Sequence, residues 1–378
     1  MNAPPKVAVA GGSLGGLMAG LELLAAGADV HIFERSGRVL DDRGAGIVMQ
    51  PHTLRILTER CGLDEDQTGT WLRYRQYLDQ SGEVSSRQAM PQLMTSWGLL
   101  YRAFRAAFPP ERYLEKQPLV SFEGSGSDVK AAFGNADTRS FDLLVGADGS
   151  RSFIRNQLLP EIAPRYAGYV AWRGVVPESE ASESLLLTFD DHFTFQQMRH
   201  SHILCYLIPG PTGELERGKR RINWVWYWNV PEKELSELLT GRDGKVHEFS
   251  LPPGQVGEEA LAAQAAIAEG VLSPQFRELW KATKEPFIQP ILDLAVNKMV
   301  FGRTILLGDA AFIPRPHTAG STAKAAMNAI LLGETLASHP EDIDSSLRSW
   351  EPSQLQLGHQ LEFQGTTMGN RSQFGRSH

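Results

Sequence analysis

The beginning of the chain alternates short apolar runs with a glycine-rich turn. Residues 7–10 form an apolar run, residues 11–16 read GGSLGG, and residues 17–24 have the apolar spacing of a helix. A second apolar run over residues 28–33 ends in Glu34. This order predicts a βαβ unit that binds a dinucleotide. The turn would meet the pyrophosphate, and the acid, about 20 residues after the first glycine, would accept ribose hydroxyls.

Beyond this unit the pattern changes to strand alternation. Residues 71–79 alternate as a strand does, and a turn near 80–82 leads to a return strand. Aromatic-rich strands follow between 166 and 228 without helices, which predicts an antiparallel sheet. From 231 to 282 the pattern is helical, and a strand near 288–294 leads back to the first domain. We therefore predict an α/β domain of residues 1–70, 95–165 and 285–378, interrupted by a sheet domain of residues 71–94 and 166–284.

A second polar turn follows an apolar strand late in the chain. Residues 304–311 read TILLGDAA, which predicts a strand that delivers Asp309 to a turn. Small residues at 320–323 then open an alanine-rich helix. The first N–H groups of a helix have no partner within it, so they can face an anionic or electron-rich ring. Together with the glycine turn, Asp309 predicts a dinucleotide held at both ends.

The composition is that of an ordinary globular protein. The 378 residues, 42% hydrophobic and 21% charged, can form about two domains. The net charge of −7 and the lack of a basic run argue against a nucleic acid partner, and no apolar stretch reaches the roughly 20 residues of a membrane span. Without an apolar signal core or metal-ligand spacing at Cys61 and Cys205, we expect a cytoplasmic protein that binds no metal. The oligomeric state stays open, a homodimer included, and residues 365–378 have the composition of a loose tail.

Three motifs of the chain resemble those of the single-component flavoprotein aromatic hydroxylases. They are GGSLGG at 11–16, GADGSRSFIR at 146–155 and GDAA at 308–311, and the resemblance covers nearly the whole chain. It implies an α/β fold with a Rossmann-like FAD-binding domain of the para-hydroxybenzoate hydroxylase type and an inserted antiparallel-sheet domain for the substrate. Within the family, residues 166–174, 226–230 and 314–317 look most like those of a hydroxylase of small dihydroxypyridines.

The resemblance implies an FAD-dependent monooxygenase that hydroxylates a small hydroxylated pyridine or phenol. NADH or NADPH would reduce FAD, and molecular oxygen would form a flavin C4a-hydroperoxide that delivers OH to the ring. The protein must exclude water, place the ring and help to remove a proton from the substrate hydroxyl. Two alternatives stay open here: an FAD oxidoreductase without productive oxygen insertion, and a flavin-binding regulatory protein without turnover.

Carried over residue by residue, the resemblance implies contacts along the adenosine half of FAD. The glycine turn would hold the pyrophosphate with Arg102 on its side, Glu34 would bind the ribose, and the backbone near Val120 would meet the adenine. The implied residues of this half are Gly11, Ser13, Leu14, Gly15, Gly16, Glu34, Arg35, Arg102 and Val120. Ser13 departs from the pattern, which has glycine there, but serine is small enough to be tolerated.

The flavin half is implied to lie between the second and third motifs. Asp148 and Gly149 are expected beside the pyrophosphate and the path of the nicotinamide cofactor, with Arg155 supporting their turn. Asp309 would bind the ribityl hydroxyls, and the helix start would stabilise negative charge at the flavin N1–C2=O edge. The implied residues of this half are Gln50, Asp148, Gly149, Asp309, Pro316, Gly320, Ser321, Thr322 and Ala323. Phe312 stands where many relatives have histidine.

His317 is the first candidate for a catalytic base, because it precedes the helix start and histidine titrates near neutral pH. The alternative is a histidine that only bonds the backbone of the turn. Tyr227, the second catalytic candidate, and Arg173 would meet a phenolate-like substrate, while Trp228 would wall its pocket. Alternating tryptophans are also typical of one core face of a strand, in which case Tyr227 points the other way. Gln50 would touch the flavin or the substrate, or only begin a helix.

Overall fold

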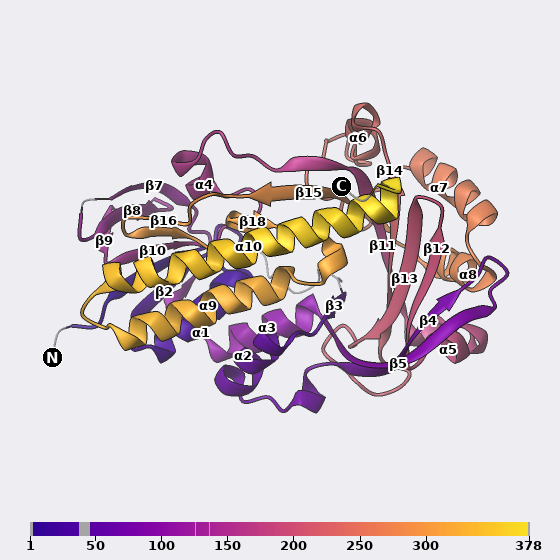
Figure 1. Ribbon diagram of the computed structural model, residues 1–378, viewed down its shortest axis with the longest axis horizontal. Helices are drawn as coiled ribbons and strands as arrows, with labels where there is room; N and C mark the ends of the chain where they lie inside the picture. The colour runs from indigo at the N-terminus through magenta and orange to yellow at the C-terminus, as the bar shows by residue number, and fades with distance from the viewer. Residues whose placement is uncertain (1–2, 38–45, 125, 136, 377–378) are drawn as a thin grey trace.

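The computed structural model describes residues 3–37, 46–124, 126–135 and 137–376. Figure 1 shows an elongated molecule in which an α/β body and a sheet body lie along the long axis. Helix α10 (Ile343–Phe374) runs from the first body to the second. No helix of the described residues is long and apolar enough to cross a membrane.

A six-stranded sheet with the order β16-β17-β10-β1-β2-β6 forms the centre of the α/β body. Its strands pair in parallel except β16 with β17, and the parallel pairing of β1 with β2 around α1 confirms the predicted βαβ unit. Because a helix (residues 14–25) and a small three-stranded sheet (residues 119–141) both pack on it, β1 is apolar and buried at four of its five positions. The strands are β1 (Lys6–Ala10), β2 (Asp29–Phe33), β6 (Tyr113–Leu114), β10 (Leu143–Gly146), β16 (Val300–Phe301) and β17 (Thr304–Leu306).

The other elements of this body are helices and a small three-stranded sheet. They are α1 (Leu14–Ala25), α2 (Pro51–Cys61), α3 (Trp97–Ala107), α4 (Phe153–Leu158), α9 (Ser321–Ser338), β7 (Leu119–Gly124), β8 (Val129–Phe133) and β9 (Arg139–Phe141). Short 3-10 turns are η1 (Glu65–Gln67), η2 (Pro110–Arg112), η4 (Gly308–Ala310) and η5 (Pro316–Thr318). Helices α1 and α9 pack against each other, so the glycine turn and the Gly-Asp turn meet at the same end of the body.

A nine-stranded sheet with the order β18-β15-β11-β14-β13-β12-β4-β5-β3 forms the second body. It is antiparallel except where β4 pairs with β12, as the succession of aromatic strands predicts. Its strands are β3 (Gly46–Val48), β4 (Thr70–Leu78), β5 (Val84–Ser96), β11 (Arg165–Pro177), β12 (His192–Met198), β13 (Ser201–Ile208), β14 (Arg221–Asn229), β15 (Phe287–Ala295) and β18 (Phe312–Ile313). Around it lie η3 (Glu178–Glu180), α5 (Glu183–Phe189), α6 (Glu232–Leu238), α7 (Glu258–Val271) and α8 (Pro274–Ala282).

Two segments lie elsewhere than the sequence predicts. Strand β15 pairs with β11, so the predicted boundary at residue 285 separates β15 from its own sheet. The expected loose tail is also wrong as far as it is described, since α10 continues to Phe374. Its last turns pack on the nine-stranded sheet, where Asn229 donates to the Gln373 carbonyl at 2.8 Å and Phe374 lies edge-on to Tyr169.

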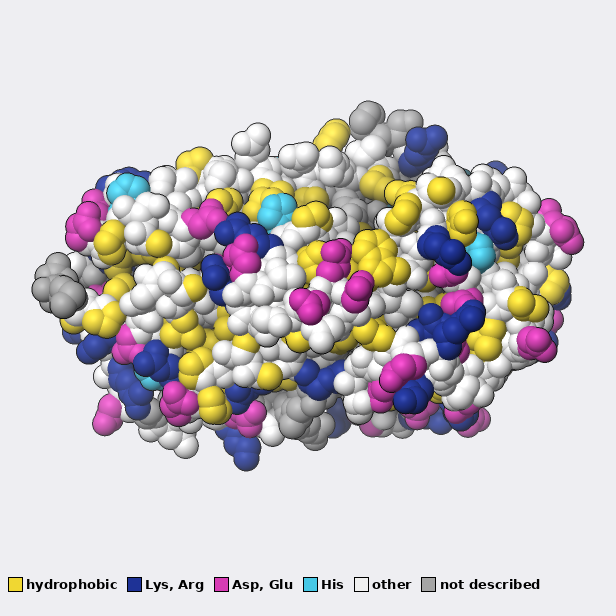
Figure 2. All heavy atoms as spheres, turned by 90° about the horizontal axis from the view of Figure 1, so that it is seen from below, with side chains coloured by type: hydrophobic (Ala, Val, Ile, Leu, Met, Phe, Trp, Pro, Cys, Tyr) yellow, Lys and Arg dark blue, Asp and Glu magenta, His cyan; other side chains and the backbone are white. Residues whose placement is uncertain are grey.

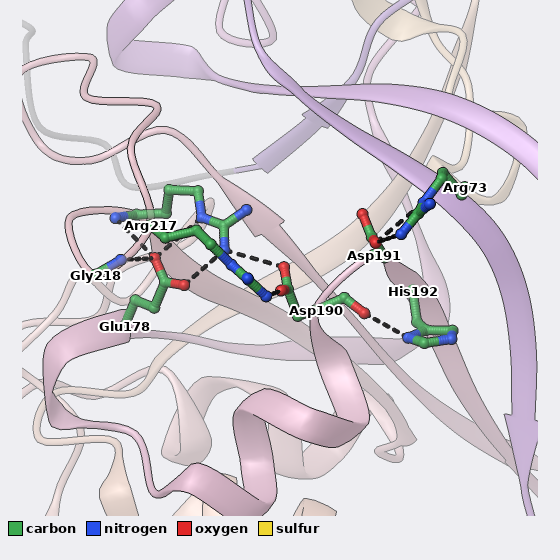
Figure 3. Close-up of polar contacts among 8 residues, drawn as sticks. Arg73, Glu178, Asp190, Asp191, His192, Arg217 and Gly218 are labelled. Atoms are coloured by element: carbon green, nitrogen blue, oxygen red, sulfur yellow. Dashed lines mark hydrogen bonds and ion pairs between the residues drawn. The ribbon is translucent and has the colours of Figure 1, made fainter.

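An ion-pair cluster with a buried centre closes one end of the nine-stranded sheet (Figure 3). Arg220 contacts Glu178 at 2.6 Å and Asp190 at 3.0 Å, and Arg217 pairs with Asp190 as well. Burial opposes the charge of Glu178, but the hydrogen bonds from Arg220 prevail and lower the pKa of this carboxyl. Each charge has a partner from another loop, so the cluster holds loops together and we assign it no chemistry.

Candidate active site

The glycine turn joins β1 to α1 and lies directly against the second motif. Gly11 has a φ of 107°, and a Cβ there would lie 2.4 Å from the Ala147 carbonyl oxygen. A Cβ on Gly16 would lie 1.9 Å from the Gly11 carbonyl oxygen, so the tight turn requires glycine at both positions. Ser13 is the N-cap of α1 and makes no side-chain cap within the described chain. Because Leu14 and Gly15 then form the first turn of α1, its free N–H groups are open to an anion.

Glu34 ends β2 beside this turn. Its Oε2 accepts from the Gly12 N–H at 2.7 Å, and its Oε1 accepts from the Ser36 N–H at 2.7 Å. The side chain is buried, and these two bonds fix the carboxylate while leaving lone pairs for ribose hydroxyls. Arg35, the next residue, is exposed.

The segment expected to meet the adenine begins next to Glu34. The Gln117 N–H donates to the Glu34 carbonyl at 2.9 Å, and β7 follows two residues later. Val120 on β7 is 53% exposed, so its backbone and side chain are open to a ligand. Arg102 on α3 is half-buried, and its Nη2 is buried without a partner among the residues described.

Asp148 and Gly149 form the turn after β10. Asp148 Oδ2 accepts from the Ile154 N–H at 3.2 Å, while Oδ1 is buried and finds no partner in the described chain. Burial raises the pKa of the Asp148 carboxyl, and hydrogen bonds from Ser152 and backbone N–H groups oppose the shift. Gly149 has a φ of 77° and open space where a Cβ would stand.

Arg155 connects this turn with the third motif. Its guanidinium donates to the Ser150 carbonyl at 2.8 Å and to the Ala310 carbonyl at 3.3 Å. The side chain is buried, and burial lowers the pKa of Arg155, an effect that nearby Asp148 opposes. The predicted support of the turn is therefore present, and it extends to the Gly-Asp turn as well.

Asp309 lies in the η4 turn after β17, with its side chain 45% exposed. Its Oδ1 accepts from the Ser321 hydroxyl at 2.9 Å. Helix α9 begins at Ser321 after the N-cap Gly320, so the N–H groups of Ser321, Thr322 and Ala323 belong to its first turn. Pro316, in the preceding η5 turn, is exposed.

These residues fit FAD. A buried carboxylate oxygen without a partner, Asp148 Oδ1, can accept a hydroxyl hydrogen, and a buried guanidinium nitrogen without one, Arg102 Nη2, can donate to a phosphate oxygen. FAD carries both groups. Asp148 belongs to the second motif, and Arg102 lies on α3, which packs against α1.

A row of polar groups faces this region from the nine-stranded sheet. Tyr227 on β14 lies across from Ala171 on β11, two positions from Arg173, so their side chains share a face. Arg173 Nη1 donates to Gln289 Oε1 at 2.6 Å, and its Nε is buried without a described partner. Tyr206 joins the face from β13, and burial raises the pKa of its hydroxyl to about 12. Burial also raises the pKa of Tyr227, while Arg173 opposes the shift.

Trp228 does not belong to this row. It lies with Trp224 and Trp226 on the opposite face of β14, where its ring meets Trp226 with centroids 5.4 Å apart. That face packs into the core formed with α7 and α8, which includes Trp280. Side chains alternate along a strand, so Trp228 and Tyr227 cannot wall one pocket, and we remove Trp228 from the site.

His317 lies in the η5 turn among aromatic rings. Its Nε2 is 2.8 Å from the Tyr169 hydroxyl, and its ring lies 4.7 Å from that of Tyr227 and 5.4 Å from that of His202. Burial, with smaller contributions from His202 and Arg315, lowers the pKa of His317 to about 3. His317 is therefore a neutral imidazole at pH 7, bonded to a side chain rather than only to the backbone of its turn.

Gln50 is the N-cap of α2, and its side chain makes no cap within the described chain. The segment before it reaches the polar face, since the Gly46 N–H donates to Asn223 Oδ1 at 3.1 Å. Residues 38–45, before Gly46, lie outside the described residues. Gln50 is half-buried and lies in the chain between β3 of the sheet body and α2 of the α/β body.

Several residues of the site escaped prediction from sequence. Lys324 and Asn328 on α9 contact the Gly-Asp turn, and Ser372 near the end of α10 bonds His202 Nδ1 at 2.8 Å. Ser321, Lys324 and Asn328 follow helical spacing, which would have placed them on one face. No sequence pattern around Ser372 would have predicted its contact with His202. Phe312 is buried against His359 of α10 instead of facing a cofactor. No group of three or more His, Cys, Asp or Glu among the described residues could hold a metal.

Comparison with known proteins shows the family of this chain. A family model described as FAD binding domain-like matches residues 166–293, the stretch from β11 to β15. The 2,6-dihydroxypyridine 3-monooxygenase of Paenarthrobacter nicotinovorans is 36% identical over 98% of this chain and 92% of its own. The 6-hydroxynicotinate 3-monooxygenase of Pseudomonas fluorescens is 26% identical over 89% of this chain and 83% of its own. The structure of 2,6-dihydroxypyridine-3-hydroxylase from Arthrobacter nicotinovorans superposes with a TM-score of 0.92 and 34% identity, covering 100% of this chain and 95% of that one.

The chain belongs to the family of FAD-dependent aromatic hydroxylases. It is an FAD-dependent monooxygenase with the predicted fold, and NAD(P)H is the typical reductant of this family. This conclusion is supported over an oxidoreductase without oxygen insertion and over a regulatory flavoprotein.

Proposed function

We propose that this enzyme hydroxylates a small dihydroxypyridine or a related hydroxylated ring on the polar face of the nine-stranded sheet. The observation that carries the proposal is the buried row of Arg173, Tyr227 and Tyr206, in which Arg173 Nε has no described partner. A hydroxypyridine in its anionic form supplies the negative oxygen that a buried guanidinium requires. The two relatives named above act, by their names, on rings of this kind.

We place FAD across the three motifs as the resemblance implies. The glycine turn and Arg102 would hold the pyrophosphate, Glu34 the ribose, and Asp309 the ribityl chain. When bound, FAD supplies the reduction and the oxygen activation of the reaction. Its ring would then lie between the start of α9 and the sheet face, with Gln50 at the border.

The chain's own residues would position the substrate and handle its proton. Arg173 would orient the substrate anion, which is also the better nucleophile, and Tyr227 would donate its hydroxyl to a ring oxygen. A neutral His317 can accept a hydrogen bond but holds a full proton poorly, because its pKa is lowered to about 3. We therefore propose that the pair of Tyr169 and His317 hydrogen-bonds the substrate hydroxyl and orients it, without storing its proton.

The partners of the reaction would be a small aromatic substrate and molecular oxygen. The free thiols, half-buried Cys61 and buried Cys205, agree with the cytoplasmic location that we proposed from the sequence. Neither contributes to the site. Figure 2 shows acidic and basic side chains interspersed over the face seen there, unlike the single-sign surface of a nucleic-acid-binding protein.

The test is a screen of dihydroxypyridines, hydroxynicotinates and phenols for stimulated oxidation of NADH and of NADPH, with the product identified by mass. We expect a dihydroxypyridine to give a product heavier by one oxygen. Arg173→Leu should raise its KM, whereas Trp228→Phe, on the opposite face, is the matched control. If Arg173→Leu leaves the KM and the rate of hydroxylation unchanged, the proposed pocket is contradicted.

A further inference from the structure

Lys324 is a fully buried cation at the beginning of α9. Its side chain is 1% exposed, and its Nζ lies 3.0 Å from Asp309 Oδ1. The same Nζ donates to the Phe312 carbonyl. A buried ammonium is costly unless it is paired and hydrogen-bonded, and here both partners come from the Gly-Asp turn.

Lys324 belongs to a row of three polar residues on one face of α9. Ser321, Lys324 and Asn328 are three and four residues apart, so their side chains lie above one another along the helix. Ser321 and Lys324 both contact Asp309 Oδ1, and Asn328 Oδ1 accepts from the Gly308 N–H at 3.1 Å. All three side chains therefore bind the same turn. We call these three residues the α9 clamp.

The two carboxylate oxygens of Asp309 differ in the hydrogen bonds that they accept from the clamp. Both donors described for this carboxylate, the Ser321 hydroxyl and the Lys324 ammonium, bind Oδ1. The side chain as a whole is 45% exposed, although Lys324 beneath it is buried. Two donors on one oxygen restrain the carboxylate, while Oδ2 has no donor among the described residues.

We propose that Lys324 is a positioning residue for FAD, which holds Asp309 Oδ1 so that Oδ2 is presented to the ribityl hydroxyls. This inference rests on the proposed placement of the ribityl chain at Asp309. It assigns a function to a lysine that follows the small residues Ser321, Thr322 and Ala323 of the helix start. Burial lowers the pKa of Lys324 and Asp309 opposes that shift, as a paired ammonium requires.

The experiment compares Lys324→Met, Asp309→Ala and the double variant. The Kd of FAD is measured from the fluorescence of FAD released as the holoenzyme is diluted. ADP, which lacks the ribityl chain, is titrated as a competitor. Lys233→Met, at an 81% exposed position on α6, is the matched control. If Lys324→Met does not fold, Lys324→Gln, which keeps a hydrogen-bond donor, takes its place.

We expect Lys324→Met to weaken FAD about ten- to a hundredfold, which corresponds to the loss of a hydrogen bond to a charged group. The affinity for ADP should stay unchanged, and Lys324→Met should have no further effect once Asp309 is alanine. The double variant should also resist urea better than Asp309→Ala, in which the buried ammonium of Lys324 has lost its counterion. Lys233→Met should bind FAD as the unmodified protein does.

The outcomes separate the inference from the proposed function. An FAD affinity that is unchanged in Asp309→Ala would overturn the ribityl placement itself. If Asp309→Ala weakens FAD but Lys324→Met does not, or if Lys324→Met weakens FAD and ADP equally, the positioning role of Lys324 is refuted and the ribityl placement stands.

Discussion

Two half-buried histidines should make the protein unusually sensitive to mild acid. The rings of His202 and His317 lie 5.4 Å apart beside Tyr227, with Arg315 close by. Burial lowers the pKa of His202 to about 4 and, with the neighbouring charges, that of His317 to about 3. In the unfolded chain both would titrate near 6.5. Near pH 5 the unfolded chain therefore binds two protons that the folded protein does not take up.

Proton linkage gives the sign and size of the change in the free energy of unfolding with pH. Stability is lost as the pH falls below about 6.5, because the unfolded state gains protons, and the loss ends only when the folded histidines titrate near their lowered pKa values. At pH 5 each histidine lies about 1.5 pH units below its unfolded pKa, which costs about 2 kcal/mol. The pair should thus account for about 4 kcal/mol between pH 7.5 and pH 5, a large part of the stability of an ordinary domain.

The assay is urea unfolding at pH 7.5 and at pH 5.0 with the same saturating FAD. His202→Gln and His317→Gln remove the titrating group and keep an amide for hydrogen bonding. Each should lose about 2 kcal/mol less than the unmodified protein between the two pH values. His339→Gln, at the exposed end of α9, controls for the loss of a histidine. If both variants lose as much stability as the unmodified protein, the two histidines are not held neutral and the reasoning fails.

Further predictions concern the two faces of the sheet and the motif turns. Arg173→Leu should raise the KM of the substrate about ten- to a hundredfold, the loss of one charge-assisted hydrogen bond, with an unchanged Kd of FAD in steady-state and binding assays. Trp228→Phe should change kcat and KM by less than about twofold, because the ring lies on the face of the sheet opposite the proposed pocket. Arg155→Met should lower the stability to urea by about 3 kcal/mol and weaken FAD as well, since it leaves carbonyls of two motif turns without their donor.

The α/β body could be predicted from the sequence because its motifs are contiguous. The glycine turn needs Gly11 and Gly16 for local steric reasons, and Glu34 follows at the end of the next strand. Parallel pairing then brings the ends of β1, β10 and β17 to one edge. The meeting of the three turns therefore follows from chain order and handed crossovers.

In the sheet body, the sequence pattern predicts the two faces of a strand but not which of them meets the cofactor. Alternation places Trp224, Trp226 and Trp228 on one face and Tyr227 on the other, which the structure confirms. It does not say which face meets the cofactor, because both are buried and aromatic. That choice depends on α7 and α8 covering the tryptophans, a contact between segments far apart in sequence.

The end of α10 and Lys324 could not be predicted for a related reason. Residues 365–374 are rich in glycine and polar residues, and their helix is held by contacts such as Ser372 with His202. Gly369 approaches Tyr169 so closely that a Cβ would lie 2.7 Å from its hydroxyl oxygen. A lysine near the start of a helix is usually solvated, and only the fold shows that Lys324 points inward to Asp309.

The most direct test of the account is turnover of 2,6-dihydroxypyridine under isotopically labelled oxygen, ¹⁸O₂. We expect one labelled oxygen atom in the product for each NAD(P)H consumed. At a substrate concentration near the KM of the unmodified protein, we expect Arg173→Leu to form much less of this product while it still binds FAD. Stimulated oxidation of NAD(P)H that yields only hydrogen peroxide from this substrate and its hydroxypyridine analogues would contradict the proposed pocket.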